Sequence, residues 1–359
     1  MADYKPDRPA FASKYTSGPP ITGGTDEQLI QRVIEAAQTE ATPPIAIPAS
    51  DAMVLALVKH RDQLADHALM HPSLTSGLAA EVVDKQSFYQ QCLDADVATP
   101  QTAFPEDVES LIRLGDQFQF PLLLKPVFGH LWRERLKGNK LLVAETQSEF
   151  IAMVESFGDD ATGLMVQELI PGTEKNIWVG AVYRGTGGEH DCCFVGQKVR
   201  QYPPDFGSAS YAKSQFVSEI AELSWKFLDA VDYRGICGTE FKYDARDGQY
   251  KMIEVNPRPT LWFHLVASSG VELLYQAYRD LAGDRIEVDT QREGVAWCFQ
   301  DKDILTWWHH FKRLNFAPLW TTFAPWNHGA VIKWSDPMPA LKIPFYYWRR
   351  IRERMFGAK

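Results

Sequence analysis

The stretch IEVNPR at residues 253–258 decides how this sequence is interpreted, because a related polar stretch, GTEFK at 238–242, precedes it across one turn. The segment between them, DARDG at 244–248, has the residue types of a turn, and the flanking runs have the pattern of strands. The sequence therefore predicts a β-hairpin. On such a hairpin Glu240 and Glu254 would lie on adjacent strands with their carboxylates directed at one point.

The side chains of this hairpin suit a metal ion and a phosphoryl group. Asn256 shares a face with Glu254, and two carboxylates plus an amide oxygen are hard ligands of the kind that Mg²⁺ prefers. Arg258 has a proline on each side and would offer a planar fork to a phosphoryl group. The alternative is a surface hairpin with solvated acids, and this is the better interpretation of any single Glu taken alone. The joint arrangement favours the metal site.

The hairpin resembles the metal-binding end of the ATP-grasp superfamily, whose late signature is a Glu, a short hairpin and then Glu-x-Asn-x-Arg. The resemblance implies an α/β (α+β) fold in which two α/β subdomains clasp ATP behind a shortened Rossmann-like pre-domain. It implies that Glu240, Glu254 and Asn256 bind Mg²⁺, with Mn²⁺ as the alternative metal. It also implies that Arg258 acts in catalysis by stabilising charge on the transferred phosphoryl group.

Three further stretches resemble the nucleotide-binding motifs of the superfamily. Lys85 opens a helix and would reach the phosphates, and Lys125 ends a buried strand at 120–126, as does the family lysine that touches the α and β phosphates. Residues 164–174 resemble the hinge strand against which adenine lies. The resemblance thus assigns ATP contacts to Lys85, Lys125, Gln167, Glu168, Leu169, Ile170 and Glu174, with Glu174 placed at the ribose.

The phosphate loop and a basic pair complete the resemblance. The loop at 127–139 is poor in glycine, so His130 or Arg133 is expected to replace backbone contacts to phosphate. Lys198 and Arg200 precede Tyr-Pro-Pro and resemble a segment of bacterial carboxylate–amine ligases related to D-aspartate ligase. We place both at the phosphate or acyl-phosphate site as catalytic residues.

The chain divides into three predicted parts. Residues 1–83 are expected to form a partial pre-domain behind an N-terminal arm, with helices at 27–40 and 51–65 around a strand at 44–48. Residues 84–285 would form the ATP-grasp domain, with a small lid subdomain at about 103–172. In that lid we expect a helix at 105–118 with Pro105 in its first position. Residues 286–359 form a tryptophan-rich extension that ends in a basic, aromatic tail.

Composition limits the class of protein. The net charge of −9 argues against a nucleic-acid partner, because no domain-wide basic surface is available. Five cysteines without CxxC spacing predict reduced thiols, hence a cytoplasmic protein. The opening 20 residues are polar and rich in proline, which predicts no signal peptide, and no run of about 18 apolar residues predicts a membrane span.

These features predict an ATP- and Mg²⁺-dependent ligase of the C–N bond-forming type, which activates a carboxylate as an acyl phosphate for attack by an amine. One alternative is a kinase of the same fold that phosphorylates a hydroxyl. Another is a nucleotide-binding module at a membrane surface that has lost catalysis. The carboxylate would be a small molecule or lipid-linked, and a homodimer is expected from related ligases. The tail at 342–356 would lie on the inner, anionic face of a membrane, or else pack on the enzyme body or a second subunit.

Overall fold

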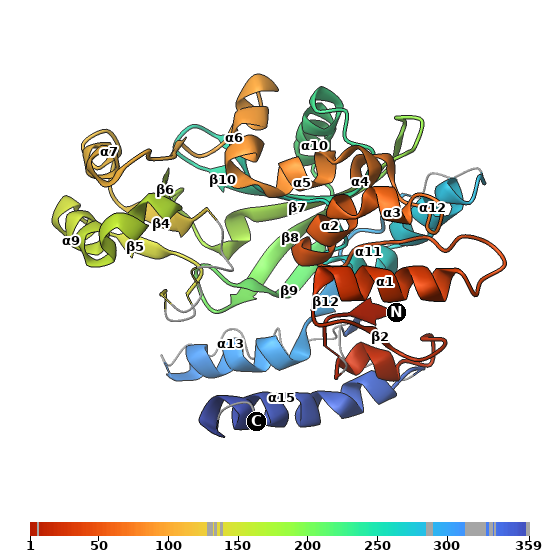
Figure 1. The fold of residues 1–359 in the computed structure, drawn as a ribbon. Helices are drawn as coiled ribbons and strands as arrows, with labels where there is room; N and C mark the ends of the chain where they lie inside the picture. Colours follow the sequence, from red (N-terminus) through yellow and green to blue (C-terminus); the bar gives the residue numbers. More distant parts are fainter. Residues whose placement is uncertain are drawn as a thin grey trace.

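Eleven of the strands fall into a large and a small sheet, with helices on both (Figure 1). The computed structural model describes residues 1–5, 7–127, 132, 135–136, 139–284, 290–312, 328–329, 333 and 335–356. Most of the predicted phosphate loop, including His130 and Arg133, lies outside these residues.

The large sheet has seven strands in the order β11-β10-β7-β8-β9-β12-β13. Neighbouring strands are antiparallel apart from the parallel pair β12–β13. The predicted hairpin is its edge and consists of β10 and β11. The strand bounds are β7 Ile177–Arg184, β8 His190–Tyr202, β9 Ser208–Ser214, β10 Gly235–Asp244, β11 Gln249–Asn256, β12 Ala296–Cys298 and β13 His328–Gly329.

Both faces of this sheet are buried. In β7 the side chains alternate, so that Trp178 and Val182 pack in one core while Val179 and Tyr183 pack in another. The first core is covered by α5 (Leu78–Val83), α6 (Lys85–Asp94) and α10 (Ser218–Ala230), and the second by α11 (Phe263–Ser268) and α12 (Leu273–Leu281). The site residues on β7, β8 and β10 therefore stand on a rigid layer.

The small sheet has the order β3-β6-β4-β5 and carries α7 and α9 (Figure 1). It has its own apolar core, which includes Leu111, Leu124, Phe150 and Val166. Its division from the large sheet agrees in position with the predicted lid, although the domain limits stay a prediction. The bounds are β3 Thr102–Ala103, α7 Val108–Leu114, β4 Leu122–Pro126, β5 Leu142–Ala144, α9 Gln147–Phe157 and β6 Leu164–Glu168.

Local capping explains where these helices start. The prediction that Pro105 opens a helix is wrong, because α7 begins at Val108. Asp107 is its N-cap and accepts a hydrogen bond of 2.6 Å from the backbone N–H of Ser110, whose hydroxyl lies against the Asp107 backbone in turn. The N-cap of α9 is Thr146, whose side chain accepts from the N–H of Glu149.

The N-terminal region contributes short helices and little sheet. Two-residue strands β1 (Ala2–Asp3) and β2 (Ile21–Thr22) pair in parallel, and the helices are α1 Asp26–Ala37, α2 Asp51–Lys59, α3 Arg61–Leu64 and α4 Pro72–Ser76. The predicted strand at 44–48 is reduced to one bridge between Ile45 and Leu69. Proline at positions 44 and 48 removes ladder donors, which explains the missing strand.

The C-terminal region packs on the body in the described residues. Helix α13 (Gln300–Lys312) lies against β8, and α15 (Met338–Phe356) lies against the 3₁₀ turn Pro9–Ala12 (Figure 1). Tyr346 accepts a 3.0 Å hydrogen bond from Arg8, and Tyr347 donates one of 2.7 Å to Asp301 of α13. Within the described residues, no helix is long and apolar enough to cross a membrane.

Candidate active site

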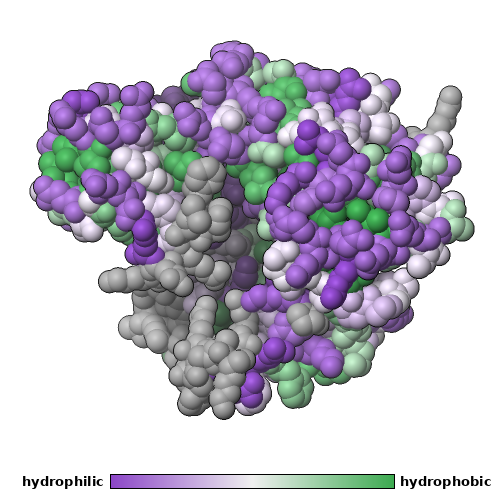
Figure 2. All heavy atoms as spheres, viewed as in Figure 1, coloured by the Kyte–Doolittle hydropathy of each residue, from purple (hydrophilic) through white to green (hydrophobic). Residues whose placement is uncertain are grey.

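A cavity of about 560 Å³ is lined by residues of both sheets, at the hollow between the small lobe and the body (Figure 2). Most of the predicted site residues meet there. Arg200 and Glu174 do not line it. Those that do are Lys85, Lys125, Gln167, Glu168, Leu169, Ile170, Lys198, Glu240, Glu254, Asn256 and Arg258.

The acidic end of the cavity is built by the register of the hairpin. Glu240 and Glu254 are direct cross-strand partners, and Asn256 lies opposite Gly238 one step along the same ladder. The carboxylate of Glu254 is exposed to the cavity but enclosed by protein. This burial and the facing charge of Glu240 raise the pKa of Glu254. A divalent cation between the two carboxylates would relieve their repulsion.

The donor set fits a metal that arrives with a phosphate ligand. Among the residues that the structure describes, no three His, Cys, Asp or Glu side chains form a ready-made metal centre. Glu240, Glu254 and Asn256 supply three oxygen ligands from β10 and β11, and all three line the cavity. Six-coordinate Mg²⁺ would need phosphate and water oxygens to complete its shell. The pair of carboxylates therefore suits Mg-nucleotide better than the free ion.

A buried lysine holds one of these acids. Lys198 Nζ donates to Glu240 Oε1 at 2.7 Å, and the two side chains are only 5% and 17% exposed. The predicted phosphate contact and a predicted metal ligand are thus bound to each other. Lys198 remains at the cavity wall, where it could also meet a phosphoryl oxygen.

Arg258 has a partner from the N-terminal region. Its Nε donates to Asp51 Oδ1 at 2.5 Å, and both residues line the cavity. Asp51 is the first residue of α2, so the predicted pre-domain reaches this site through one carboxylate. Contact of Arg258 with a phosphoryl group would require it to exchange or share this partner.

Lys125 is oriented by a polar relay. Its ammonium donates to Gln167 Oε1, and Gln167 Nε2 donates to Tyr89 Oη at 2.7 Å and to Thr102 Oγ1 at 2.8 Å. Burial, followed by the charge of Lys85, lowers the pKa of Lys125 to about 8. Gln167 is itself buried, so its position indicates that it orients Lys125 rather than reading the base.

The same relay reaches the metal-binding hairpin. Tyr89 Oη donates to the backbone carbonyl of Ile253, 3.2 Å away and adjacent to Glu254 in the chain. Lys85, the first residue of α6, donates to the carbonyl of Pro126, which follows Lys125. Helix α6 therefore ties the lysine strand β4 to the hairpin and fixes the spacing between cationic and acidic groups.

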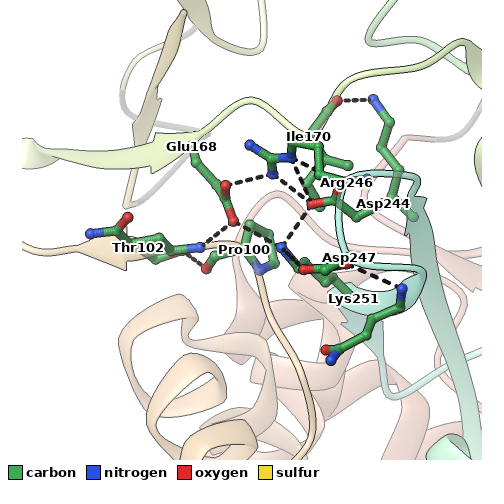
Figure 3. A network of polar contacts seen from close by, with 11 residues as sticks. Pro100, Thr102, Glu168, Ile170, Asp244, Arg246, Asp247 and Lys251 are labelled. Carbon is green, nitrogen blue, oxygen red and sulfur yellow. Dashed lines mark hydrogen bonds and ion pairs between the residues drawn. The ribbon is translucent and has the colours of Figure 1, made fainter. Parts of the chain in front are cut away.

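Glu168 belongs to an ion-pair network between the two sheets (Figure 3). Its carboxylate lies 2.7 Å from Arg246 and 3.4 Å from Lys251, and it accepts from the Gln101 N–H at 2.9 Å. The two cations also contact Asp244, whose side chain is buried. The Glu168 carboxylate thus joins β6 to the hairpin. A nucleotide base at this hinge would therefore be contacted by main-chain groups and not by the Glu168 carboxylate.

The rest of the predicted hinge is close to a lysine that the sequence interpretation missed. Lys242 Nζ donates to the carbonyl of Ile170 at 2.6 Å and lines the cavity beside Leu169. Burial, followed by the charge of Lys198, lowers the pKa of Lys242. Glu174 opens the turn after the hinge, outside the cavity lining, and its charge opposes the lowering of the Lys242 pKa. Contact of Glu174 with ribose stays a prediction.

The structure gives Arg200 a different role from the predicted one. Its guanidinium forms a bidentate pair with Asp303 of α13, at 2.9 and 2.7 Å, and stacks on Tyr211 with 4.3 Å to the ring centroid. Register irregularities flank Arg200 in β8, so it does not share a face with Lys198. Arg200 holds α13 on the sheet and is withdrawn from the catalytic set.

Several cavity residues had no strong signal in the sequence. Lys242 follows Glu240 by two positions and could have been expected on the same face, whereas the others depend on contacts between distant segments. The unassigned polar residues that line the cavity include Asp51, Lys140, Gln201, Asp205, Lys242 and Thr260.

Known proteins resemble this chain in sequence and fold. The family described as the ATP-binding domain of the carbamoyl-phosphate synthase L chain matches residues 208–287. The D-aspartate ligase of Enterococcus faecium (strain Aus0004) is 23% identical over 273 residues, which are 74% of this chain and 65% of that protein. The chain thus spans slightly less than two thirds of that relative.

Solved structures agree with this similarity. An ADP complex of N5-carboxyaminoimidazole ribonucleotide synthetase aligns with a TM-score of 0.65 and 14% identity, over 87% of this chain and 78% of the other. Biotin carboxylase from Campylobacter jejuni, bound to a β,γ-ATP ligand, aligns with a TM-score of 0.61 and 16% identity, over 80% and 65% of the two chains. At these identities the likeness concerns the fold.

Proposed function

We propose that this chain, whose predicted ATP-grasp fold agrees with the solved structures it resembles, is an ATP- and Mg²⁺-dependent carboxylate–amine ligase. One observation carries the proposal: Glu240 and Glu254 face each other at one end of a cavity whose other polar walls hold Lys85 and Lys125. Such a cavity suits a metal-bound triphosphate. Mn²⁺ is the alternative metal, since the same oxygen ligands suit both ions.

In the first step a carboxylate oxygen of the substrate attacks the γ phosphorus, and the bond between that phosphorus and the β–γ bridging oxygen breaks. ADP leaves and an acyl phosphate forms. Lys125 and Lys85 balance charge on the nucleotide phosphates, and Lys198 and Arg258 stabilise the transferred group. Glu240, Glu254 and Asn256 would hold the metal, which would supply positive charge to neutralise the nucleotide phosphates.

In the second step the amine attacks the acyl carbon, the carbon–phosphate oxygen bond breaks, and inorganic phosphate leaves as the nitrogen loses a proton. The protein positions the reactants and keeps water from the acyl phosphate. No enzyme nucleophile is needed for either step. One of the two substrates is proposed to be an amino acid, because a relative that aligns with 74% of this chain is named for D-aspartate.

The test is release of ADP and phosphate from Mg-ATP with pooled carboxylates and amino acids, D-aspartate among them. A ligase requires both an amine and a carboxylate. The Glu254→Ala protein is the control: loss of a metal ligand should lower turnover by about hundredfold or more while the melting temperature stays near the wild-type value. Wild-type turnover in that variant would show that the metal site is elsewhere.

Other outcomes separate the alternatives. Release of ADP with a hydroxyl compound alone, and a stable phosphorylated product, would make the protein a kinase. Bound ATP without turnover in any pool would favour the nucleotide-binding module. The intact acidic end of the cavity counts against the module that has lost catalysis, and the product of the reaction decides between ligase and kinase.

We also propose that the protein works at the inner face of a membrane, on a lipid-linked carboxylate. Met338, Leu341, Phe345 and Trp348 recur at helical spacing along α15 and are 47%, 61%, 71% and 61% exposed. Lys342 and other basic side chains accompany them. An exposed apolar stripe with basic neighbours suits an anionic membrane surface, although the whole chain carries −9. A homodimer through this stripe is the competing prediction.

A further inference from the structure

One ion pair at the cavity contains a carboxylate that the mechanism above does not use. Arg258 Nε donates to Asp51 Oδ1 at 2.5 Å, and both residues line the cavity. The side chain of Asp51 is 50% exposed, whereas that of Arg258 is 17% exposed. The hydrogen bond engages Oδ1, which leaves Oδ2 of this half-exposed carboxylate able to accept from a ligand.

The Asp51 carboxylate stands on a rigid element of the N-terminal region. It is the first residue of α2, and the preceding Ser50 caps this helix by accepting from the Met53 N–H at 3.3 Å. Val54 and Leu57 of the same helix are buried in the first core of the large sheet. The carboxylate is therefore presented to the cavity from a packed helix and not from a loop.

The other carboxylates that line the cavity in the described residues have different surroundings. Glu240 and Glu254 face each other as the proposed metal site, and Glu168 belongs to the ion-pair network between the sheets. Asp205 lies in the turn between β8 and β9 and acts by its charge on the lysine beside the hinge. Asp51 is thus the acid that accompanies the proposed phosphoryl contact.

Asp51 lies at the end of the cavity where the phosphoryl group is transferred. The ion pair places it one hydrogen bond away from the guanidinium of Arg258, which is proposed to bind that group. Burial and the facing charge of Glu240 raise the pKa of Glu254, and the charge of Asp51 adds to this effect. Asp51 does not join the two glutamates as a metal ligand, because no three acidic, His or Cys side chains of the described residues form a metal-binding group.

We propose that Asp51 binds the amine substrate in its ammonium form and holds its nitrogen beside the acyl phosphate. In an acyl phosphate a single oxygen joins the acyl carbon to phosphorus, so the attacking nitrogen must arrive next to the group that Arg258 holds. A primary alkylamine is charged at neutral pH and donates to a carboxylate in a charge-assisted hydrogen bond. An alcohol lacks this attraction. The inference rests on the proposed ligase function and assigns the subsite of its amine.

The reaction leaves Asp51 as a carboxylate throughout. The bound ammonium first loses one proton to solvent, and the neutral nitrogen attacks the acyl carbon. As the C–N bond forms, the nitrogen gains positive charge, which the adjacent carboxylate stabilises. The carbon–phosphate oxygen bond then breaks, and the second proton goes to the departing phosphate. Arg258 can bind the phosphoryl group through its terminal nitrogens while Nε stays on Asp51.

The experiment compares Asp51→Asn with wild type, using Mg-ATP with a carboxylate and an amine that support turnover. Loss of the charge-assisted hydrogen bond should raise KM for the amine about tenfold to hundredfold, with KM for ATP and for the carboxylate changed less than about twofold. The melting temperature should stay near the wild-type value, because the pair is half exposed. Asp51→Glu keeps the charge and should recover part of the affinity.

The matched control is Asp205→Asn, which removes another carboxylate of the same cavity. Asp205 has a φ of 71°, and asparagine tolerates this backbone conformation well. The control should leave KM for the amine unchanged. An equal rise of this KM in Asp205→Asn and Asp51→Asn would contradict a specific ammonium site at Asp51.

Trapping with hydroxylamine separates ammonium binding from a purely structural role. Hydroxylamine is mostly uncharged at neutral pH and converts an acyl phosphate to a hydroxamate, so it reports the first step without needing the charge of Asp51. Asp51→Asn should form the hydroxamate within about twofold of the wild-type rate. If this rate falls as much as amide formation, Asp51 only positions Arg258 and the inference is wrong. A higher KM for the carboxylate would assign Asp51 to that substrate and would overturn the inference too.

A binding readout separates this inference from the proposed function. Propylamine and propanol are added to the Mg-ADP complex, and the melting temperature is followed in wild type and Asp51→Asn. If no carboxylate and amine support turnover, the ligase proposal fails, yet a shift with propylamine alone, seen in wild type alone, would still support an ammonium site. Without that shift both proposals fall. If turnover occurs and neither KM for the amine nor the shift depends on Asp51, only this inference is wrong.

Discussion

Lys198 and Glu240 form a buried ion pair of 2.7 Å between β8 and β10, so that the cation proposed to bind phosphate neutralises an acid proposed to bind metal. A second acid, Glu254, faces Glu240 across the hairpin. With Lys198 in place, one positive charge already offsets one of the two carboxylates. This arrangement explains how the site could stay metal-free until a nucleotide brings the metal in.

Removal of Lys198 should allow free Mg²⁺, and not only Mg-nucleotide, to bind at the two carboxylates. In Lys198→Met the two carboxylates face each other without their cation, so free Mg²⁺ should bind without nucleotide and raise the melting temperature more than in wild type. Turnover should fall by about hundredfold, because a charge on the transferred phosphoryl group is lost. Thermal shift with Mg²⁺ alone checks the first effect. Lys213→Met, an exposed lysine on the adjacent strand β9, is the control and should change neither quantity.

ATP affinity should depend on pH through Lys125. Burial lowers the pKa of this lysine to about 8, so it is charged below pH 8 and becomes neutral above it in the nucleotide-free protein. ATP binds the charged form, and its dissociation constant should therefore rise by about tenfold between pH 7 and pH 9. Binding near pH 8.5 should take up a proton, which calorimetry in buffers of different ionisation enthalpy measures.

The control for this pH dependence is Lys125→Arg, because arginine stays charged over the whole range. Its ATP affinity should vary much less between pH 7 and pH 9. An unchanged slope in that variant would assign the titration to another group, such as Lys85, whose pKa is also lowered by burial.

Local sequence patterns were sufficient to predict the parts of the site that are built from residues close together in the chain. The hairpin places Glu240 opposite Glu254 because a turn and strand alternation fix the register, and both were predicted from residues 238–258. The lysine at the end of β4 was predicted from a short apolar run in the same way. These elements depend on few distant contacts.

The failures have a different origin. Arg200 was predicted in the site because, with Lys198 and Tyr-Pro-Pro, it resembles a ligase segment, but strand irregularities and Asp303, about a hundred residues away, decide its position. The pair Arg258–Asp51 joins segments about two hundred residues apart. A local sequence pattern does not show which distant segments come into contact, so such pairs could not be predicted from it. The ion pairs of the Glu168 carboxylate with Arg246 and Lys251 were not foreseen for the same reason, whereas a backbone contact of Glu168 with adenine stays a prediction.

The network of Glu168 should stabilise the connection between the two sheets (Figure 3). Glu168→Ala would leave Arg246 and Lys251 with Asp244 alone and remove the acceptor for the Gln101 N–H. We expect a loss of about 1–3 kcal/mol in the free energy of unfolding, and faster hydrogen exchange in β3. Denaturant unfolding and exchange measurements check this.

A matched control lies in the same lobe. Glu109 pairs with Arg113 at 2.9 Å on α7, but the two side chains are 83% and 59% exposed. Because exposed pairs contribute little, Glu109→Ala should leave both measurements unchanged. Equal effects of the two substitutions would contradict a special role of the Glu168 network.

The last prediction concerns the exposed stripe on α15. Phe345 and Trp348 lie on it, and Arg352 stacks over the Trp348 ring at 5.2 Å, which places a positive charge beside the apolar surface. The double variant Phe345→Ser with Trp348→Ser should bind vesicles containing anionic phospholipid about tenfold or more weakly than wild type, because two aromatic side chains no longer insert. Wild-type binding should weaken with salt and be small on neutral vesicles, since charge attraction contributes. Tyr275→Ser, an exposed aromatic on α12, is the control. The stripe is a subunit interface instead if wild type binds neither kind of vesicle and light scattering shows a dimer for wild type but a monomer for the double variant.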